Sequence, residues 1–185
     1  MIRSSARVVP FTANRRMVAA SAAVSARKST IHAITEADVT EPRRILRERQ
    51  ERTGEKLSFT AYIVACLARA VAEQPQLNSF RRGRKLVLLG DVTVSTLVER
   101  ELEGERVPEP VAIRAAQNKS YLQIHEEIRE AQRHAADRLG SLSGSEWIRF
   151  IPGFLLGAFI RLASRSIRMA ERYGEVCVTA VGMHG

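Results

Sequence analysis

Only two cysteines, Cys66 and Cys177, occur in the 185 residues of the chain. They lie far apart in the sequence, each in an apolar run, and neither has a partner at the spacing of a metal site. Buried cysteines behave as small apolar residues, and free thiols persist in reducing compartments. We therefore predict two buried free thiols, no metal site and a cytoplasmic protein.

Aromatic residues are also scarce, at 5% of the sequence, although 29 Lys and Arg against 20 acidic residues give a net charge of +9. A basic excess is typical of proteins that bind nucleic acid, an anionic membrane surface or a polyanionic small molecule. The arginines are scattered and few aromatic residues lie among them. Binding of nucleic acid is therefore not expected.

No hydrophobic run is long enough to span a bilayer. The most apolar segment, residues 147–170, is interrupted by Arg149, Pro152 and Arg161. After Pro152 the segment has the pattern of an amphipathic helix, with Arg161, Arg165 and Arg168 on one side. Such a helix could lie on a membrane surface. We favour a packed helix with a basic solvent-facing side, and we do not expect membrane binding.

Acidic residues are absent before Glu36, whereas residues 1–35 contain six basic residues and several serines. This composition is also that of an organellar transit peptide, so an organellar protein is the alternative to a cytoplasmic one. The segment has no apolar core of the signal-peptide type. With 185 residues, the chain is long enough for one domain that buries roughly 70% of its unfolded surface.

Residues 56–80, KLSFTAYIVACLARAVAEQPQLNSF, organise the rest of the chain. Ser58 stands at the position of an N-cap, and Pro75 prevents a helix from continuing much further, so the sequence predicts a helix over residues 59–73. Apolar residues recur at helical spacing and predict one buried stripe, made of Phe59, Ile63, Cys66, Leu67, Ala70 and Val71.

The other elements follow from alternation, capping and turn signals. We expect strands at residues 29–40, 85–90, 92–99, 111–114 and 174–185, and helices at residues 40–53 and 121–138. Gly90 and Asp91 are expected at the bend of a hairpin, and residues 99–110 in an exposed loop. The basic turn at residues 81–85 is interpreted as a solvated loop. Ser120 and Gln123 form a capping-box pattern.

Three segments together resemble one family: KLSF with PQLN, PVAIRAAQNKSYLQIHEEI, and the final GEVCVTAVGMHG. They resemble the catalytic domain of the 2-oxo acid dehydrogenase (dihydrolipoamide) acyltransferases, which shares its fold with chloramphenicol acetyltransferase. The basic arm RRMVAASAAVSA is similar to that of the family. The resemblance implies a two-layer α/β sandwich, an open mixed sheet with helices packed on it. It divides the chain into an arm, residues 1–28, and an acyltransferase-like domain, residues 29–185, with a helical insert at about 147–170.

The resemblance also implies chemistry. Acyl transfer between coenzyme A (CoA) and a thiol such as dihydrolipoamide needs a base for the thiol and a hydrogen-bond donor for the oxyanion. In the family the base is the histidine of a C-terminal His-x-x-x-Asp-Gly motif, and the donor is a hydroxyl on the strand matched by residues 174–185. The two come from neighbouring subunits of a trimer. Thr179 occupies the hydroxyl position, whereas Cys177 and Ala180 replace the family's Thr and Asn.

The sequence has no His-x-x-x-Asp-Gly motif, no lipoyl domain and no peripheral-subunit-binding domain. None of its histidines (His32, His125, His134, His184) stands in that motif, and we expect His125 and His134 on a solvent-facing helix surface. We therefore expect a domain that lacks its C-terminal catalytic segment and is inactive alone. The full-length form would be a homotrimer that uses CoA, with 2-oxo acid dehydrogenase components as partners. The alternatives are a non-catalytic trimerising or acyl-CoA-binding relative and a basic membrane-surface protein.

Overall fold

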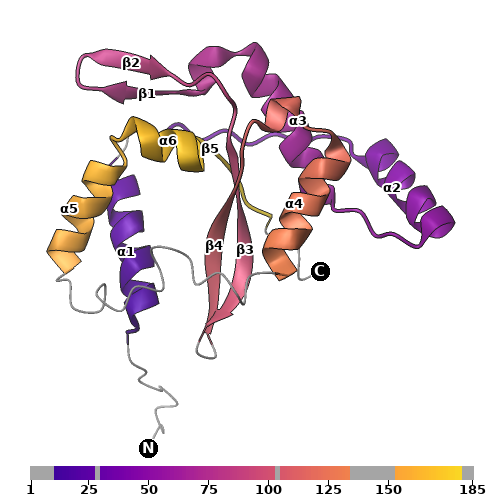
Figure 1. Ribbon diagram of the computed structural model, residues 1–185, viewed down its shortest axis with the longest axis horizontal. Coiled ribbons are helices and arrows are strands. Elements are labelled where there is room, and N and C mark those ends of the chain that lie inside the picture. The colour runs from indigo at the N-terminus through magenta and orange to yellow at the C-terminus, as the bar shows by residue number, and fades with distance from the viewer. Residues whose placement is uncertain (1–10, 28–29, 103–104, 134–152, 181–185) are drawn as a thin grey trace, which may run out of the picture. The chain divides into compact units, whose positions relative to one another are not determined.

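The computed structural model describes residues 11–27, 30–102, 105–133 and 153–180 (Figure 1). Two compact units divide the chain, one with Met1–Ile31 and Leu139–Ala163, the other with His32–Arg138 and Ser164–Gly185. In the first unit, helix α1 (Ala13–Ser25) packs against helix α5 (Gly153–Ala163). No helix in the described part of the chain combines the length and the apolar character needed to cross a membrane.

The second unit contains a three-stranded mixed sheet. Strand β3 (Val94–Leu102) lies in its centre, antiparallel to β4 (Glu105–Ile113) and parallel to β5 (Val176–Val178). Helices α3 (Phe59–Glu73) and α4 (Tyr121–Arg133) pack with the sheet around one apolar core (Figure 1). The mixed sheet and the packing of α3 and α4 confirm the predicted α/β class. Residues 134–138 of the second predicted helix lie outside the described residues.

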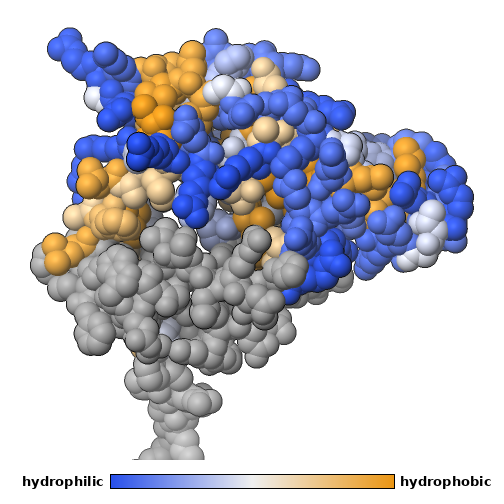
Figure 2. Space-filling view, viewed as in Figure 1, coloured by the Kyte–Doolittle hydropathy of each residue, from blue (hydrophilic) through white to orange (hydrophobic). Residues whose placement is uncertain are grey.

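The remaining elements of this unit are α2 (Thr40–Thr53), the 3-10 turns η1 (Pro75–Leu77) and η2 (Ala116–Asn118), strands β1 (Ser79–Arg82) and β2 (Lys85–Leu88), and α6 (Ile167–Tyr173). Helix α2 ends at Gly54 as predicted, with φ of 72°. Strands β1 and β2 form a separate antiparallel ribbon. Leu86 and Leu88 are exposed on it, and Figure 2 shows apolar surface over this ribbon.

The helix predicted from residues 59–73 has the predicted ends but not the predicted buried face. Its buried residues are mostly small: Ala61, Val64, Ala65, Ala68 and Val71. Cys66 and Ala70 are exposed instead. Apolar residues occupy almost the whole circumference of this helix, so spacing alone does not select a face. The alanine side is the one that lets the helix approach the sheet closely, and it forms the core.

The predicted hairpin around Gly90 and Asp91 is wrong. Strand β2 pairs with β1 across a turn that contains Gly83, at φ of 62°, and β3 pairs with β4. The segment predicted as an exposed loop, residues 99–110, is therefore largely strand. Pro108 and Pro110 are compatible with β4 because β4 lies at the edge of the sheet, where an N–H is not required on the outer side.

The predicted strand at residues 29–40 is also wrong. Residues 30–39 form no ladder, and Ile31 and Ile34 are almost fully exposed. An alternating pattern yields a strand only where a sheet edge is available to pair with it. Similarly, the helix expected to run to residue 170 is interrupted. Helix α5 begins just after Pro152 as predicted but ends at Ala163, and α6 is a separate helix.

Asn78, the last residue of the Pro-x-Leu-Asn motif, holds the loop that leads into β3. It is 2% exposed, and its Nδ2 donates to the carbonyls of Leu89 (3.1 Å) and Asp91 (3.0 Å). The carbonyl of Asn78 accepts a 2.9 Å bond from the Leu89 N–H. One side chain thus joins the end of α3 to the start of the central strand.

We predict that Asn78→Ala lowers the free energy of unfolding by roughly 2–3 kcal/mol, because two carbonyls lose their buried donor. Urea denaturation followed by circular dichroism measures the change. Asn118→Ala, at an exposed position, is the control and should stay within about 0.5 kcal/mol of the parent protein. Equal effects of the two substitutions would contradict this role of Asn78.

Candidate active site

Thr179 follows directly after β5, at the edge of the mixed sheet. In the parallel pairing of β5 with β3, Val176 lies opposite Val94 and Val178 opposite Thr96. Val176 and Val178 pack against the core, whereas Cys177 and Thr179 are exposed. Successive strand side chains point to opposite faces, so β5 presents Cys177 away from the core. Thr179, which follows the strand, is exposed as well.

Cys177 and Cys66 are both exposed, contrary to the prediction of two buried thiols. Cys66 is exposed because α3 buries its alanine face, and Cys177 because alternation along β5 turns it outward. The surrounding protein atoms still desolvate the Cys177 thiol and raise its pKa. At neutral pH this thiol is therefore mostly protonated, which makes it a poor nucleophile.

Two hydroxyls on β3 and just before it hold the chain that leads into β5. Thr93 Oγ1 donates to the carbonyl of Glu171 at 3.3 Å, and Ser95 Oγ donates to the carbonyl of Tyr173. Gly174 then turns the chain with φ of 75° and ψ of 166°, a region that only glycine adopts readily. A Cβ atom at Gly174 would lie 1.9 Å from the carbonyl oxygen of Thr93. The entry into β5 therefore requires glycine.

We predict that Gly174→Ala destabilises the protein strongly and displaces β5, because both the backbone conformation and the contact with Thr93 exclude a methyl group. Gly54→Ala is the matched control, since Gly54 also has positive φ but a methyl group there would meet nothing within 4 Å. Thermal unfolding should show that Gly54→Ala lowers the free energy of unfolding by about 1–2 kcal/mol. The loss for Gly174→Ala should be roughly twice as large or more. Equal losses would refute the steric argument.

The structure describes two of the four histidines, His32 and His125. His32 is exposed in the segment before α2, and His134 and His184 lie outside the described residues. His125 was predicted to face solvent, but it is only 5% exposed, so that prediction is wrong. Its burial follows from its position on α4, between the buried Ile124 and Ile128 and one turn after Tyr121, a spacing that the sequence already displayed.

His125 fastens α4 to the start of α3. Its Nδ1 accepts a 3.0 Å hydrogen bond from the N–H of Ser58, while Tyr121 Oη donates to the Ser58 carbonyl at 3.2 Å. The Ser58 hydroxyl in turn caps α3 by accepting from the Ala61 N–H at 3.3 Å. Burial, and then the nearby Arg129 charge, lower the pKa of His125. A nitrogen that accepts this hydrogen bond cannot carry a proton, so the ring is neutral.

We predict that this arrangement makes the protein less stable in mild acid. The pKa of His125 is lower in the folded state than its unfolded value of about 6.5, so the unfolded state binds more protons as the pH falls. Its contribution to stability is complete above pH of about 6.5 and is lost as the pH falls through the folded pKa. His125→Gln should flatten the pH dependence of the urea midpoint below this pH. His32→Gln, at an exposed position, should leave it unchanged.

The described residues contain no group of His, Cys, Asp or Glu that could hold a metal ion. The observed core and sheet define a class of fold. The chain is similar in fold to dihydrolipoamide acetyltransferase cores, an α/β class built on a mixed sheet. A probable dihydrolipoamide acetyltransferase from Listeria monocytogenes 4b F2365 aligns with a TM-score of 0.63 and 22% identity, over 77% of this chain and 62% of that one.

Two further structures agree. The Azotobacter vinelandii dihydrolipoamide acetyltransferase, studied for the catalytic roles of one serine, one histidine and one asparagine, aligns with a TM-score of 0.64 and 21% identity, over 77% of this chain and 60% of that one. A truncated catalytic core of the Thermoplasma acidophilum 2-oxoacid dehydrogenase multienzyme complex aligns with a TM-score of 0.62 and 18% identity, over 76% of this chain and 65% of that one. The chain therefore spans less than two thirds of the length of these structures.

The family assignment rests on the sequence. Residues 3–146 match the model of the 2-oxoacid dehydrogenases acyltransferase (catalytic domain) family, and the chain belongs to that family. A comparison with curated proteins found no match.

Proposed function

We propose that this chain contributes to a CoA-dependent acyltransferase that moves an acyl group between CoA and a thiol such as dihydrolipoamide. The observation that carries the proposal is the exposed hydroxyl of Thr179, at the end of β5 on a chain of this family. β5 continues the core sheet, so Thr179 is attached to a rigid element and not to a free loop. A positioned donor of this kind is what an oxyanion requires.

The reaction would proceed by attack of a thiolate on the thioester carbonyl. The carbonyl oxygen gains negative charge in the tetrahedral intermediate, and the Thr179 hydroxyl would donate a hydrogen bond to it. The CoA thiolate then leaves, or is the attacking group in the reverse direction. A base must take the proton of the attacking thiol, because a free thiol has a pKa near about 8.5. His125 is not available for this role, because it is buried and its Nδ1 already accepts the Ser58 N–H.

We propose that the base comes from a His-x-x-x-Asp-Gly segment of a neighbouring subunit in a homotrimer, as the family resemblance implies, a motif that these 185 residues do not contain. An exposed donor at the edge of a sheet suits a site completed by a second subunit. One similar structure is the cubic core of the pyruvate dehydrogenase multienzyme complex. We extend this to our chain as a proposal of oligomeric assembly with 2-oxo acid dehydrogenase components. The substitutions at Cys177 and Ala180 favour one alternative, an acyl-CoA-binding relative without catalysis.

We predict negligible acyl transfer by the 185-residue chain and strong transfer once a segment with a His-x-x-x-Asp-Gly motif is supplied in a fusion. In the active fusion, Thr179→Ala should lower kcat by about 10²–10³-fold, as for loss of an oxyanion donor, while Thr179→Ser retains most activity. Thr35→Ala, at an exposed position outside the sheet, is the control. The assay follows acyl-CoA turnover with a dithiol acceptor.

Two outcomes would contradict this proposal. Robust turnover by the unextended chain that disappears in His184→Ala would show that the chain supplies its own base. A fusion that binds acyl-CoA and is fully folded, but turns over equally with Thr179→Ala, would remove Thr179 from the mechanism. Binding of acyl-CoA without turnover in every fusion would favour the non-catalytic alternative.

A further inference from the structure

The arginines of α2 differ in whether they have a carboxylate partner. Arg44 lies between two carboxylates, with Nη2 at 2.5 Å from Glu41 Oε1 and Nη1 hydrogen-bonded to Glu48. Arg43 and Arg47 lie on another face of the same helix. Neither of these two arginines has a carboxylate partner among the described residues. Like charges four residues apart on a helix destabilise it slightly. The chain nevertheless places both on one face.

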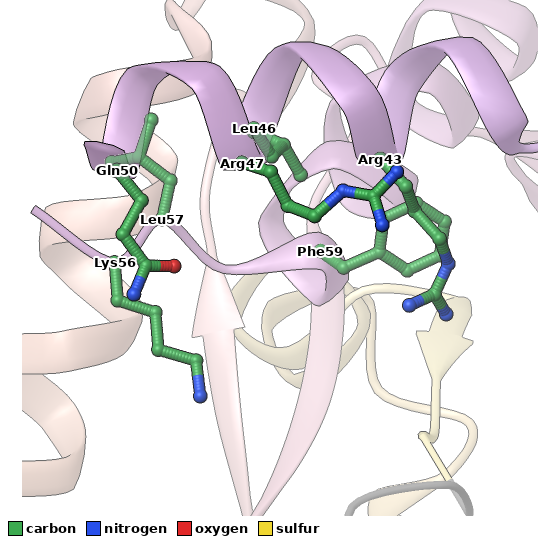
Figure 3. A pocket seen from close by; sticks show the side chains of 7 residues that line it. All are labelled: Arg43, Leu46, Arg47, Gln50, Lys56, Leu57 and Phe59. Atoms are coloured by element: carbon green, nitrogen blue, oxygen red, sulfur yellow. The ribbon is translucent and has the colours of Figure 1, made fainter. Parts of the chain in front are cut away.

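That face forms one wall of a pocket of about 250 Å³ between α2 and the segment that starts α3. Figure 3 shows side chains from both walls around it: Arg43, Leu46, Arg47, Gln50, Lys56, Leu57 and Phe59. The first four positions, all on α2, follow the i, i+3, i+4, i+7 spacing of a single helix face. Lys56 comes from the opposite wall, next to Gln50 in the view (Figure 3).

The pocket has an apolar floor beneath its cations. Leu57 is 8% exposed, and Leu46 and Phe59 are partly buried. The Arg43 guanidinium lies 4.5 Å from the centre of the Phe59 ring, a cation–π contact that orients the side chain while leaving its edge N–H groups available. Ser58, bonded to His125 and Tyr121, holds this wall in place. The three cations are exposed. The wall that starts α3 is fixed to the core through Ser58, whereas α2, which carries Arg43 and Arg47, has no buried residue.

We propose that this pocket binds the diphosphate group of an organic ligand. The pocket is lined by three cations and by no carboxylate, a charge that matches a diphosphate better than a single carboxylate. The planar guanidinium groups of Arg43 and Arg47 suit the bidentate geometry of phosphate oxygens, and Lys56 adds a point charge from the other wall. Leu46 and Leu57 offer apolar contact to the part of the ligand next to the phosphates. The pocket is smaller than most whole-ligand sites, so the remainder would extend outside it.

A diphosphate of this kind has two possible sources, CoA or a free nucleoside diphosphate. The site is defined by its own cations, so it does not depend on the acyltransferase proposal. It lies at α2 and the start of α3, whereas Thr179 follows β5. Loss of diphosphate binding and loss of acyl transfer can therefore be measured separately.

The experiment is isothermal titration of the 185-residue chain with pyrophosphate, ADP and adenosine at low ionic strength. We expect pyrophosphate and ADP to compete for one site, and adenosine not to bind. Arg47→Gln should weaken the ADP Kd roughly three- to fivefold, the effect of one solvent-exposed ion pair. The double variant Arg47→Gln with Lys56→Gln should weaken it roughly tenfold or more. Far-UV circular dichroism verifies that each variant is folded.

Arg52→Gln is the matched control, because Arg52 also lies on α2 and is exposed but does not line the pocket. It removes the same charge and should leave the ADP Kd unchanged. An equal loss with Arg52→Gln and Arg47→Gln would show general attraction to a chain of net charge +9 and overturn the site. So would failure of both pyrophosphate and ADP to bind. Competition of CoA with ADP identifies CoA as the source, and ADP binding without such competition identifies a separate nucleotide; both support the site.

Discussion

The pairing of β3 with β5 is the interaction on which the candidate site depends. β5 contains only three residues, but it adds to a strand whose inward-facing side chains, Val94, Thr96 and Val98, are almost fully buried. A short parallel strand is weak by itself, because parallel pairing needs a crossover and a covered face. Here α6, the last element of the crossover before β5, is held at its end by two hydrogen bonds that the hydroxyls of Thr93 and Ser95 donate to its carbonyls. The central strand thus both forms the core and positions the residue that would bind an oxyanion.

Hydrogen bonds at one residue, Ser58, connect the two helices that cover the sheet. Ser58 uses its hydroxyl to cap α3 and its N–H and carbonyl to bond His125 and Tyr121 of α4. Because all three polar groups of this residue are engaged, the preceding Lys56 and Leu57 are held next to the start of α3. One wall of the basic pocket is therefore a consequence of how the core is closed. A buried polar junction of this kind specifies one relative position of the elements it connects.

Most of the residues that carry the family resemblance support the fold and do not belong to the candidate site. Two of the three segments that resemble the family are mainly structural. Ser58 of the first segment bonds α4 and Asn78 of the same segment supports the loop before β3, while Ser120 of the second segment caps α4. They explain why the chain has the acyltransferase fold. Thr179 is exposed after β5 and lies outside residues 3–146, which match the family model. In the proposed function Thr179 is the donor, while the base and the partner surface would come from assembly.

The sequence by itself determined the features that depend on neighbours along the chain. Ser58 and Pro75 set the ends of α3, Gly54 ends α2, and the reciprocal bonds of Ser120 and Gln123 begin α4. Capping and turn signals are local, so they can be read without a structure. The tertiary structure alone decided which face of α3 is buried and which strands pair. Both features depend on contacts between segments that are tens of residues apart in the sequence. α3 is apolar on almost all sides, so its sequence does not indicate which side is buried. Several segments are equally strand-like, so the sequence does not indicate which of them pair.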